Sequence, residues 1–178
     1  MFKKIAAILL ILVSLTGCNI SPTSGLQSYV DSTDGYQFLY PNGWVEMKVS
    51  SGPDVVFRDL IESTENASVV FSPVTNDKTL ADLGTPSEVG YKLSKSAIAP
   101  PGSGREAELI SAEKREAGDK TYYILEYAVT LPNQKRHNIA SVAVSRGKLF
   151  TFNASTAENR WPKVADTFHR MINSFAVY

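Results

Sequence analysis

Side chains that commonly carry catalysis are scarce in this sequence. Its 178 residues include one cysteine, Cys18, and two histidines, His137 and His169. The chain contains no G-x-S-x-G, H-E-x-x-H or C-x-x-C motif, which mark hydrolases, zinc proteases and redox or zinc sites. Gly118-Asp119-Lys120-Thr121 matches only part of a phosphate-binding loop. The sequence therefore favours a non-catalytic protein, although a serine or aspartate site assembled in space stays open.

The single cysteine stands at the end of an N-terminal export signal. Lys3 and Lys4 precede an uncharged apolar run, Ile5–Val13, and Leu15-Thr16-Gly17-Cys18 follows. This run is shorter than the roughly 20 residues that span a bilayer, and it matches the apolar core of a signal peptide. Small residues directly before a cysteine form the lipobox of bacterial lipoproteins. We therefore expect a signal peptide over residues 1–17 and a lipidated Cys18. The alternative is a buried or incidental cysteine, or a plain secretory signal.

The rest of the chain has the composition of one folded domain. Residues 19–28 are rich in Ser, Pro, Gly and Thr and carry no charge, so we expect residues 18–28 to form a flexible tether. We expect the folded domain to start near Tyr29 and to span residues 29–178 as a monomer. Removal of residues 1–17 leaves 16 basic and 18 acidic side chains. This balance gives no general attraction to nucleic acid.

Strand patterns dominate the expected domain. Tyr36–Tyr40 and Trp44–Val49 flank Pro41-Asn42-Gly43, and this order predicts a β-hairpin. Further strands are predicted by apolar and alternating runs, with Ser145-Arg146-Gly147 as a turn between the last two. These runs are Val55–Asp59, Ala67–Ser72, Glu108–Arg115, Thr121–Val129, Asn138–Val144 and Lys148–Asn153.

Two helices are predicted beside these strands. Thr85-Pro86-Ser87-Glu88 forms a capping box with proline at the first helical position, and Pro100-Pro101-Gly102 ends that helix. The second helix begins near Asn159–Pro162, and its apolar residues recur at helical spacing up to Ile172. A mainly antiparallel sheet covered by helices predicts an α+β sandwich.

Two polar stretches lie at the ends of predicted elements. Gln134-Lys135-Arg136-His137-Asn138 is a basic turn that leads into a strand, and it is either a solvated hairpin tip or a docking site for an acidic partner. Glu158-Asn159-Arg160-Trp161 opens the last helix, with Trp161 expected to pack inward. Lys135, Arg136 and Arg160 are the candidate partner-binding residues.

Several motifs occur in the order found in a known family. Gly35-Tyr36-Gln37-Phe38-Leu39-Tyr40-Pro41-Asn42-Gly43-Trp44 resembles the opening G-[FY]-x-F-x-Y-P-x-x-W motif of the PsbP family, the extrinsic proteins of photosystem II. Tyr122–Tyr127, Arg136-His137, Gly147–Phe150, Glu158–Trp161 and Ser174–Val177 agree in order. The lipobox and short N-terminus are similar to those of the cyanobacterial members.

The resemblance implies a fold, a place and a role. The fold would be the PsbP/Mog1-like α-β-α sandwich, and the place would be the lumenal side of the thylakoid membrane, reached through the lipid anchor. The role would be non-catalytic assistance to the assembly or stability of photosystem II. Plant members help to retain calcium and chloride through an N-terminal arm that this chain lacks, so an early assembly role is favoured.

The same resemblance implies a divalent metal site. Family members place a histidine after the arginine and an acid before the basic-tryptophan pair, and these positions match His137 and Glu158. An imidazole with a carboxylate suits zinc or manganese, although two protein ligands make an open site. Asp31 and Asp34 are considered as additional ligands, and calcium is associated with the family. A metal carrier or buffering protein is therefore the alternative function, and no cofactor is required.

Overall fold

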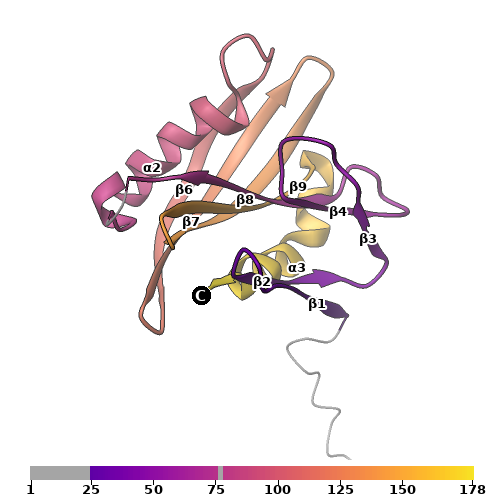
Figure 1. The fold of residues 1–178 in the computed structure, drawn as a ribbon. Helices are drawn as coiled ribbons and strands as arrows, with labels where there is room; N and C mark the ends of the chain where they lie inside the picture. Colours follow the sequence, from indigo (N-terminus) through magenta and orange to yellow (C-terminus); the bar gives the residue numbers. More distant parts are fainter. Residues whose placement is uncertain (1–24, 76–77) are drawn as a thin grey trace, which may run out of the picture.

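The computed structural model describes residues 25–75 and 78–178, in which the chain forms two antiparallel sheets and helices that pack on the two faces of the larger sheet (Figure 1). The expected signal peptide, Cys18 and most of the tether lie outside the described residues. The larger sheet has the order β3-β4-β5-β9-β8-β7-β6. Its strands are β3 (Trp44–Met47), β4 (Val55–Asp59), β5 (Asn66–Pro73), β6 (Glu106–Ala117), β7 (Lys120–Leu131), β8 (Gln134–Ser145) and β9 (Lys148–Ala157).

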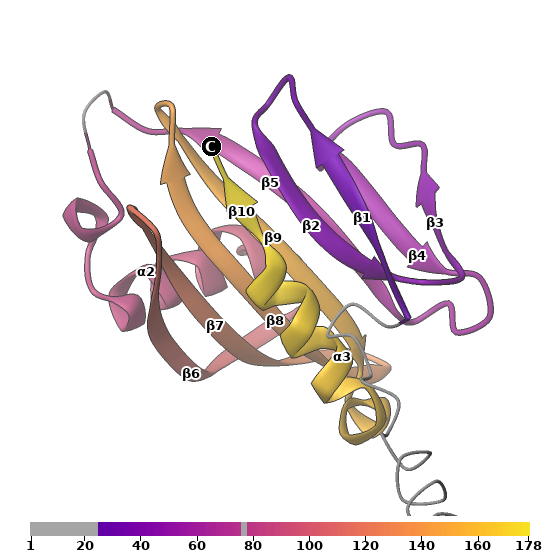
Figure 2. The same cartoon turned by 90° about the horizontal axis from the view of Figure 1, so that it is seen from below.

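A smaller sheet packs beside the long C-terminal helix on one face of the larger sheet (Figure 2). Its order is β1-β2-β10, formed by β1 (Leu26–Asp31), β2 (Tyr36–Pro41) and β10 (Ala176–Val177). The helix is α3 (Trp161–Ser174), preceded by the short turn η3 (Glu158–Arg160). Phe168, Met171 and Ile172 lie on its buried face, as the helical spacing predicts.

The opposite face of the larger sheet is covered by α2 (Pro86–Leu93) and its continuation η2 (Ser94–Ile98), after the short turn η1 (Ala81–Leu83). The predicted capping box is present. The Glu88 N–H donates to Thr85 Oγ1 at 3.3 Å, and the Thr85 N–H donates to Glu88 Oε2 at 2.8 Å. These bonds pair two backbone donors at the start of the helix.

Two apolar clusters hold these layers together. One lies between the larger sheet, α3 and the smaller sheet, and it contains Tyr36, Phe38 and Phe152. The other lies between the larger sheet and α2, and it contains Val89 and Leu125. Helix, sheet and helix thus form three layers, which confirms the predicted α+β sandwich. Among the described residues, no helix is long and apolar enough to cross a membrane.

The predicted hairpin of residues 36–49 is wrong. Strand β2 pairs with β1 and β10, whereas β3 pairs with β4 in the other sheet. The Pro41-Asn42-Gly43 turn therefore carries the chain between sheets, and Gly43 supplies the positive φ of 87° that the bend requires. Strand β1 also begins at Leu26, three residues before the expected start of the domain, because its backbone pairs with β2.

Candidate functional site

The basic stretch at the start of β8 divides between the two faces of the larger sheet. Neighbouring side chains on a strand point to opposite faces, so Arg136 and His137 diverge. Arg136 lines the face that carries η2, whereas His137 lies under the start of α3. Lys135 is exposed at the beginning of the strand. These residues were interpreted from the sequence as one polar stretch. The structure separates them into two sites: a histidine cluster around His137 and an arginine groove that Arg136 lines.

His137 is the centre of the first of these sites. Its side chain is only 4% exposed, and both ring nitrogens meet carboxylates. Nε2 lies 2.7 Å from Glu126 Oε1, and Nδ1 lies 3.2 Å from Glu158 Oε2. The indole of Trp161 covers the ring, with centroids 3.9 Å apart and planes 9° apart. The structure thus brings His137 and Glu158 together, as the family resemblance implies, and Trp161 packs inward as predicted.

Glu126 is a member of this cluster that the sequence analysis missed. It lies on β7, two positions from Ala128, which is paired with His137 in the neighbouring strand. Its other neighbour is the Ser111 hydroxyl, which donates to Glu126 Oε2 at 3.3 Å. One feature of the sequence could have drawn attention to Glu126: it is a charged residue inside the most apolar predicted strand. Only the pairing of β7 with β8 shows that it lies beside His137.

The donor set fits a divalent metal in one arrangement. One ion cannot bind both ring nitrogens, so Glu126 and Glu158 cannot be joint ligands with His137. If Nε2 donates its proton to Glu126, the lone pair of the neutral ring lies on Nδ1 and faces Glu158. His137 and Glu158 would then be ligands, and Glu126 would hold the ring orientation, as carboxylates do behind metal-bound histidines. Glu158 is 44% exposed, which leaves room for water ligands.

Arg136 belongs to a groove of about 920 Å³ on the opposite face of the sheet. Its lining mixes apolar side chains, such as Val129 and Leu131, with the amides of Asn138 and Asn153, and Arg105 also lines it. The lining residues include these two arginines and no Asp or Glu. Burial and the charge of Arg105 lower the pKa of Arg136. Two neighbouring cations without a lining carboxylate make the groove complementary to an anionic ligand.

Arg160 has a structural role in this protein. Its Nη2 lies 2.6 Å from Glu65 Oε1, and its Nε lies 3.5 Å from Glu62 Oε2. The hydrogen bond to Glu65 raises the pKa of Arg160. These ion pairs tie the start of α3 to the loop between β4 and β5. Of the three candidate partner-binding residues, Arg160 is therefore engaged inside the molecule, and Arg136 also donates to Ser155 Oγ at 2.9 Å and to the Thr64 carbonyl at 2.7 Å.

Asp31 and Asp34 lie too far from His137 to act as its ligands. Asp34 contacts Lys148 at the start of β9, with Nζ and Oδ1 2.6 Å apart, whereas His137 is paired with Thr156 near the end of that strand. Eight residues of strand, roughly 26 Å, separate these two positions. The expectation that these acids complete the His137 site is therefore wrong.

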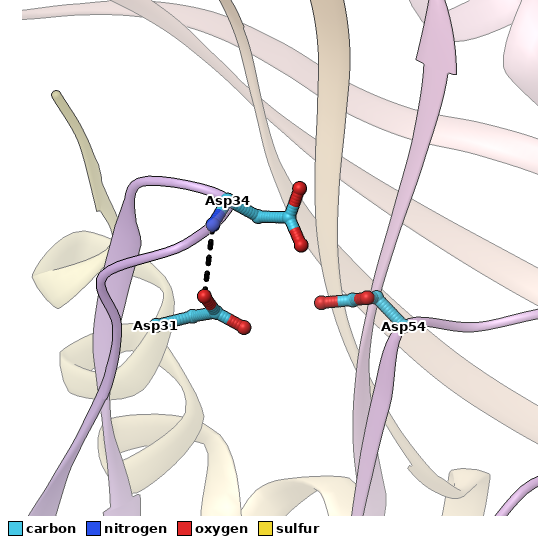
Figure 3. Close-up of side chains that lie close together, drawn as sticks. All are labelled: Asp31, Asp34 and Asp54. Atoms are coloured by element: carbon cyan, nitrogen blue, oxygen red, sulfur yellow. Dashed lines mark hydrogen bonds between the residues drawn. The ribbon is translucent and has the colours of Figure 1, made fainter.

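Asp31, Asp34 and Asp54 instead form their own cluster (Figure 3). Each carboxylate has a structural partner. Asp31 accepts the N–H of Asp34 at 2.9 Å, Asp34 holds Lys148, and Asp54 accepts the hydroxyl proton of Tyr36. A cation bound by all three would have to displace the Lys148 ammonium. The existing contacts instead give the three carboxylates structural roles, in the turn after β1 and in bridges between the two sheets.

Comparison with known proteins identifies the family of this chain. A model of the PsbP family matches residues 24–177. The chain belongs to the PsbP family. It is similar to CyanoP of Thermosynechococcus vestitus, with 55% identity over 97% of this chain and 96% of that protein.

Solved structures agree with this assignment. The solution structure of cyanobacterial PsbP (CyanoP) from Synechocystis sp. PCC 6803 is similar, with a TM-score of 0.75 and 48% identity. The match covers 93% of this PsbP-family chain and 99% of that one. The Ran-binding protein Mog1p of Saccharomyces cerevisiae shares the fold alone, with a TM-score of 0.56 and 8% identity over 85% of this chain and 95% of that one.

Proposed function

We propose that this protein is a non-catalytic accessory factor that assists the assembly or stability of photosystem II. It acts at the lumenal side of the thylakoid membrane and is held there by acyl chains on Cys18. The family match over residues 24–177 carries the proposal, since PsbP-family proteins are associated with photosystem II. The lipobox before Cys18 supports the anchor. Two or three acyl chains hold a protein stably on a bilayer.

The arginine groove is the best candidate for the docking surface. Arg105 and Arg136 attract an acidic segment of a photosystem II subunit. The amides of Asn138 and Asn153 in the lining can form hydrogen bonds with a peptide. Such charges mainly raise the association rate and make binding sensitive to salt.

Charge reversal in the groove tests this function. Tagged full-length protein would be used to recover partners from solubilised thylakoid membranes, as wild type, Arg105→Glu and Lys163→Glu. Lys163 is exposed on α3, on the other face of the sheet, and serves as a matched control. We expect photosystem II subunits with wild type and Lys163→Glu, and a loss with Arg105→Glu. Recovery of no photosystem II subunit by wild type would refute the function.

Metal handling is the second candidate, and the position of His137 between two carboxylates favours it. In this role the protein carries or buffers zinc or manganese at the membrane surface. Calorimetry with each metal and the wild-type protein, compared with His137→Ala, provides the test. We expect binding that His137→Ala abolishes. Equal affinity in both proteins, or none stronger than millimolar, would remove this candidate.

A further inference from the structure

The loop between β4 and β5 presents two large apolar side chains to solvent. Leu60 is 69% exposed and Ile61 is 96% exposed. These two values are the highest among the large hydrophobic residues of the described chain. Single exposed apolar residues are ordinary, but an adjacent pair at a loop tip is a candidate contact surface.

The backbone of this loop is held in place while the two side chains protrude. Asp59 Oδ1 accepts the N–H of Ile61 at 2.6 Å and the N–H of Glu62 at 2.7 Å. Arg136 donates to the carbonyl of Thr64 at 2.7 Å. A loop fixed in this way loses little conformational entropy when it binds.

Arg160 holds the loop in place and offsets part of the negative charge beside the apolar tip. It bonds Glu65 at 2.6 Å and lies 3.5 Å from Glu62. Glu62 and Glu65, which follow the tip in the loop, are therefore both paired with the Arg160 guanidinium. This pairing reduces the charge that would otherwise be desolvated when the tip enters an apolar environment.

The loop lies at the same end of the body as the point where the N-terminal chain arrives (Figure 2). Leu26 is paired with Pro41, and the Asn42 N–H donates to the Gly25 carbonyl at 3.0 Å. After the short turn, Trp44 is paired with Asp59, the residue before Leu60. The first described residues and the apolar tip are thus connected through one turn.

The chain between Cys18 and this end is short. Eight residue steps separate Cys18 from Leu26, so even a fully extended chain spans at most about 29 Å. A lipid on Cys18 keeps the end that carries Leu60 and Ile61 within that distance of the bilayer.

We propose that Leu60 and Ile61 insert into the membrane interface as a second contact beside the acyl chains. This inference rests on the proposed lipidation of Cys18. The acyl chains hold the protein on the membrane, and the apolar tip fixes which end faces it. His137 lies near the start of β8, at this same end, so its cluster would face the lipid headgroups.

A unique thiol label tests this contact directly. Lipidation consumes the only native cysteine, so Ile61→Cys in the full lipidated chain can carry one NBD fluorophore. Val30→Cys is the matched control, because Val30 is 54% exposed and lies toward the opposite end of β1. Both proteins are bound to protein-free phosphatidylcholine vesicles, with and without a nitroxide-labelled lipid.

We expect the label at position 61 to shift to shorter wavelength and to be quenched by the nitroxide lipid, with no shift at position 30. Equal signals at both positions would overturn the inference. A shift at position 61 only in protein-containing native membranes would also overturn it, in favour of a protein pocket. Vesicle flotation distinguishes failure of the lipid anchor from failure of the loop contact. A protein that does not float with the vesicles refutes the anchor. A protein that floats but shows no fluorescence shift at position 61 refutes only the loop contact.

Discussion

The rings of His137 and Trp161 stack face to face, with centroids 3.9 Å apart and planes 9° apart. This contact joins the start of β8 to the start of α3 and covers one side of the buried imidazole. Trp161 also contacts Phe168 edge-on, with centroids 6.0 Å apart, so its ring connects the histidine cluster to the main core.

Removal of this indole should destabilise the protein. We expect Trp161→Ala to lower the free energy of unfolding by about 2–4 kcal/mol, because it deletes a large ring packed on the core. Trp161→Phe should cost less, since it keeps an aromatic face on His137. Urea denaturation gives both values. A loss below about 0.5 kcal/mol for the alanine variant would show that the stack contributes little.

The orienting role of Glu126 can be measured through metal affinity, if the metal-binding proposal holds. Glu126→Gln keeps the side-chain shape but weakens the hold on His137 Nε2. We expect zinc affinity to fall about 10–100-fold, the usual effect of losing a carboxylate behind a histidine ligand. Glu116→Gln, on the exposed part of β6, is the control. Unchanged affinity in Glu126→Gln would exclude the orienting role.

Helix α2 lies so close to the sheet that Gly90 has no room for a side chain. A Cβ at this position would lie 2.9 Å from Leu109 Cδ2 and 3.2 Å from Leu125 Cδ2. Alanine favours helices by about 1 kcal/mol over glycine, but overpacking costs about 1–3 kcal/mol. We expect Gly90→Ala to reduce stability by about 1 kcal/mol in denaturation, whereas Ser87→Ala, exposed on the same helix, should not. A stabilised Gly90→Ala would contradict this packing.

The alkaline stability of the protein should depend on Tyr36. Burial, and the hydrogen bond that its hydroxyl donates to Asp54, raise the pKa of Tyr36 above the ordinary value of about 10. The folded protein keeps this proton at a pH where the unfolded chain releases it. The contribution of this proton to the free energy of unfolding is therefore complete below about pH 10 and is lost as pH rises further.

Denaturation curves at several alkaline pH values measure this dependence. We expect the free energy of unfolding to fall above about pH 10 and Tyr36→Phe to make that fall shallower. Burial raises the pKa of Tyr127 too, so part of the slope should persist. Tyr91→Phe, at an exposed tyrosine, should retain the wild-type slope. Identical slopes in Tyr36→Phe and wild type would contradict the assignment.

The ion pairs of Arg160 should keep the apolar loop ordered. Arg160→Ala leaves Glu65 with a nearly buried carboxylate and without its cation. We expect a lower melting temperature and faster hydrogen exchange at the amides of Ile61 and Glu62. Lys163→Ala, on the first turns of α3, should change neither. Unaltered exchange in Arg160→Ala would mean that Asp59 and Arg136 hold the loop without Arg160.

Local patterns in the sequence were sufficient for most of the fold. The capping box at Thr85 and the apolar stripe of α3 depend on residues close together in the chain, and both are confirmed. The supposed hairpin of β2 and β3 failed because its turn is compatible with pairing in either of two sheets. Strand β10 has only two residues, and its pairing with β2 cannot be read from so short a segment.

The candidate sites show the same limit. The family resemblance implied His137 and Glu158 as a pair, and His137 Nδ1 lies 3.2 Å from Glu158 Oε2. Glu126 and Arg105 enter the two sites through strand register and the position of a loop, which no local pattern specifies. The exposure of Ile61 also depends on tertiary packing, since an isoleucine beside a predicted strand is more often buried.

Crosslinking mass spectrometry on intact thylakoid membranes tests the central claim most directly. The account predicts crosslinks from Lys135, the neighbour of Arg136 at the start of β8, to a photosystem II subunit or assembly intermediate, with weaker yield in Arg105→Glu. Crosslinks confined to proteins unrelated to photosystem II, or an equal yield in the charge-reversed variant, would contradict it.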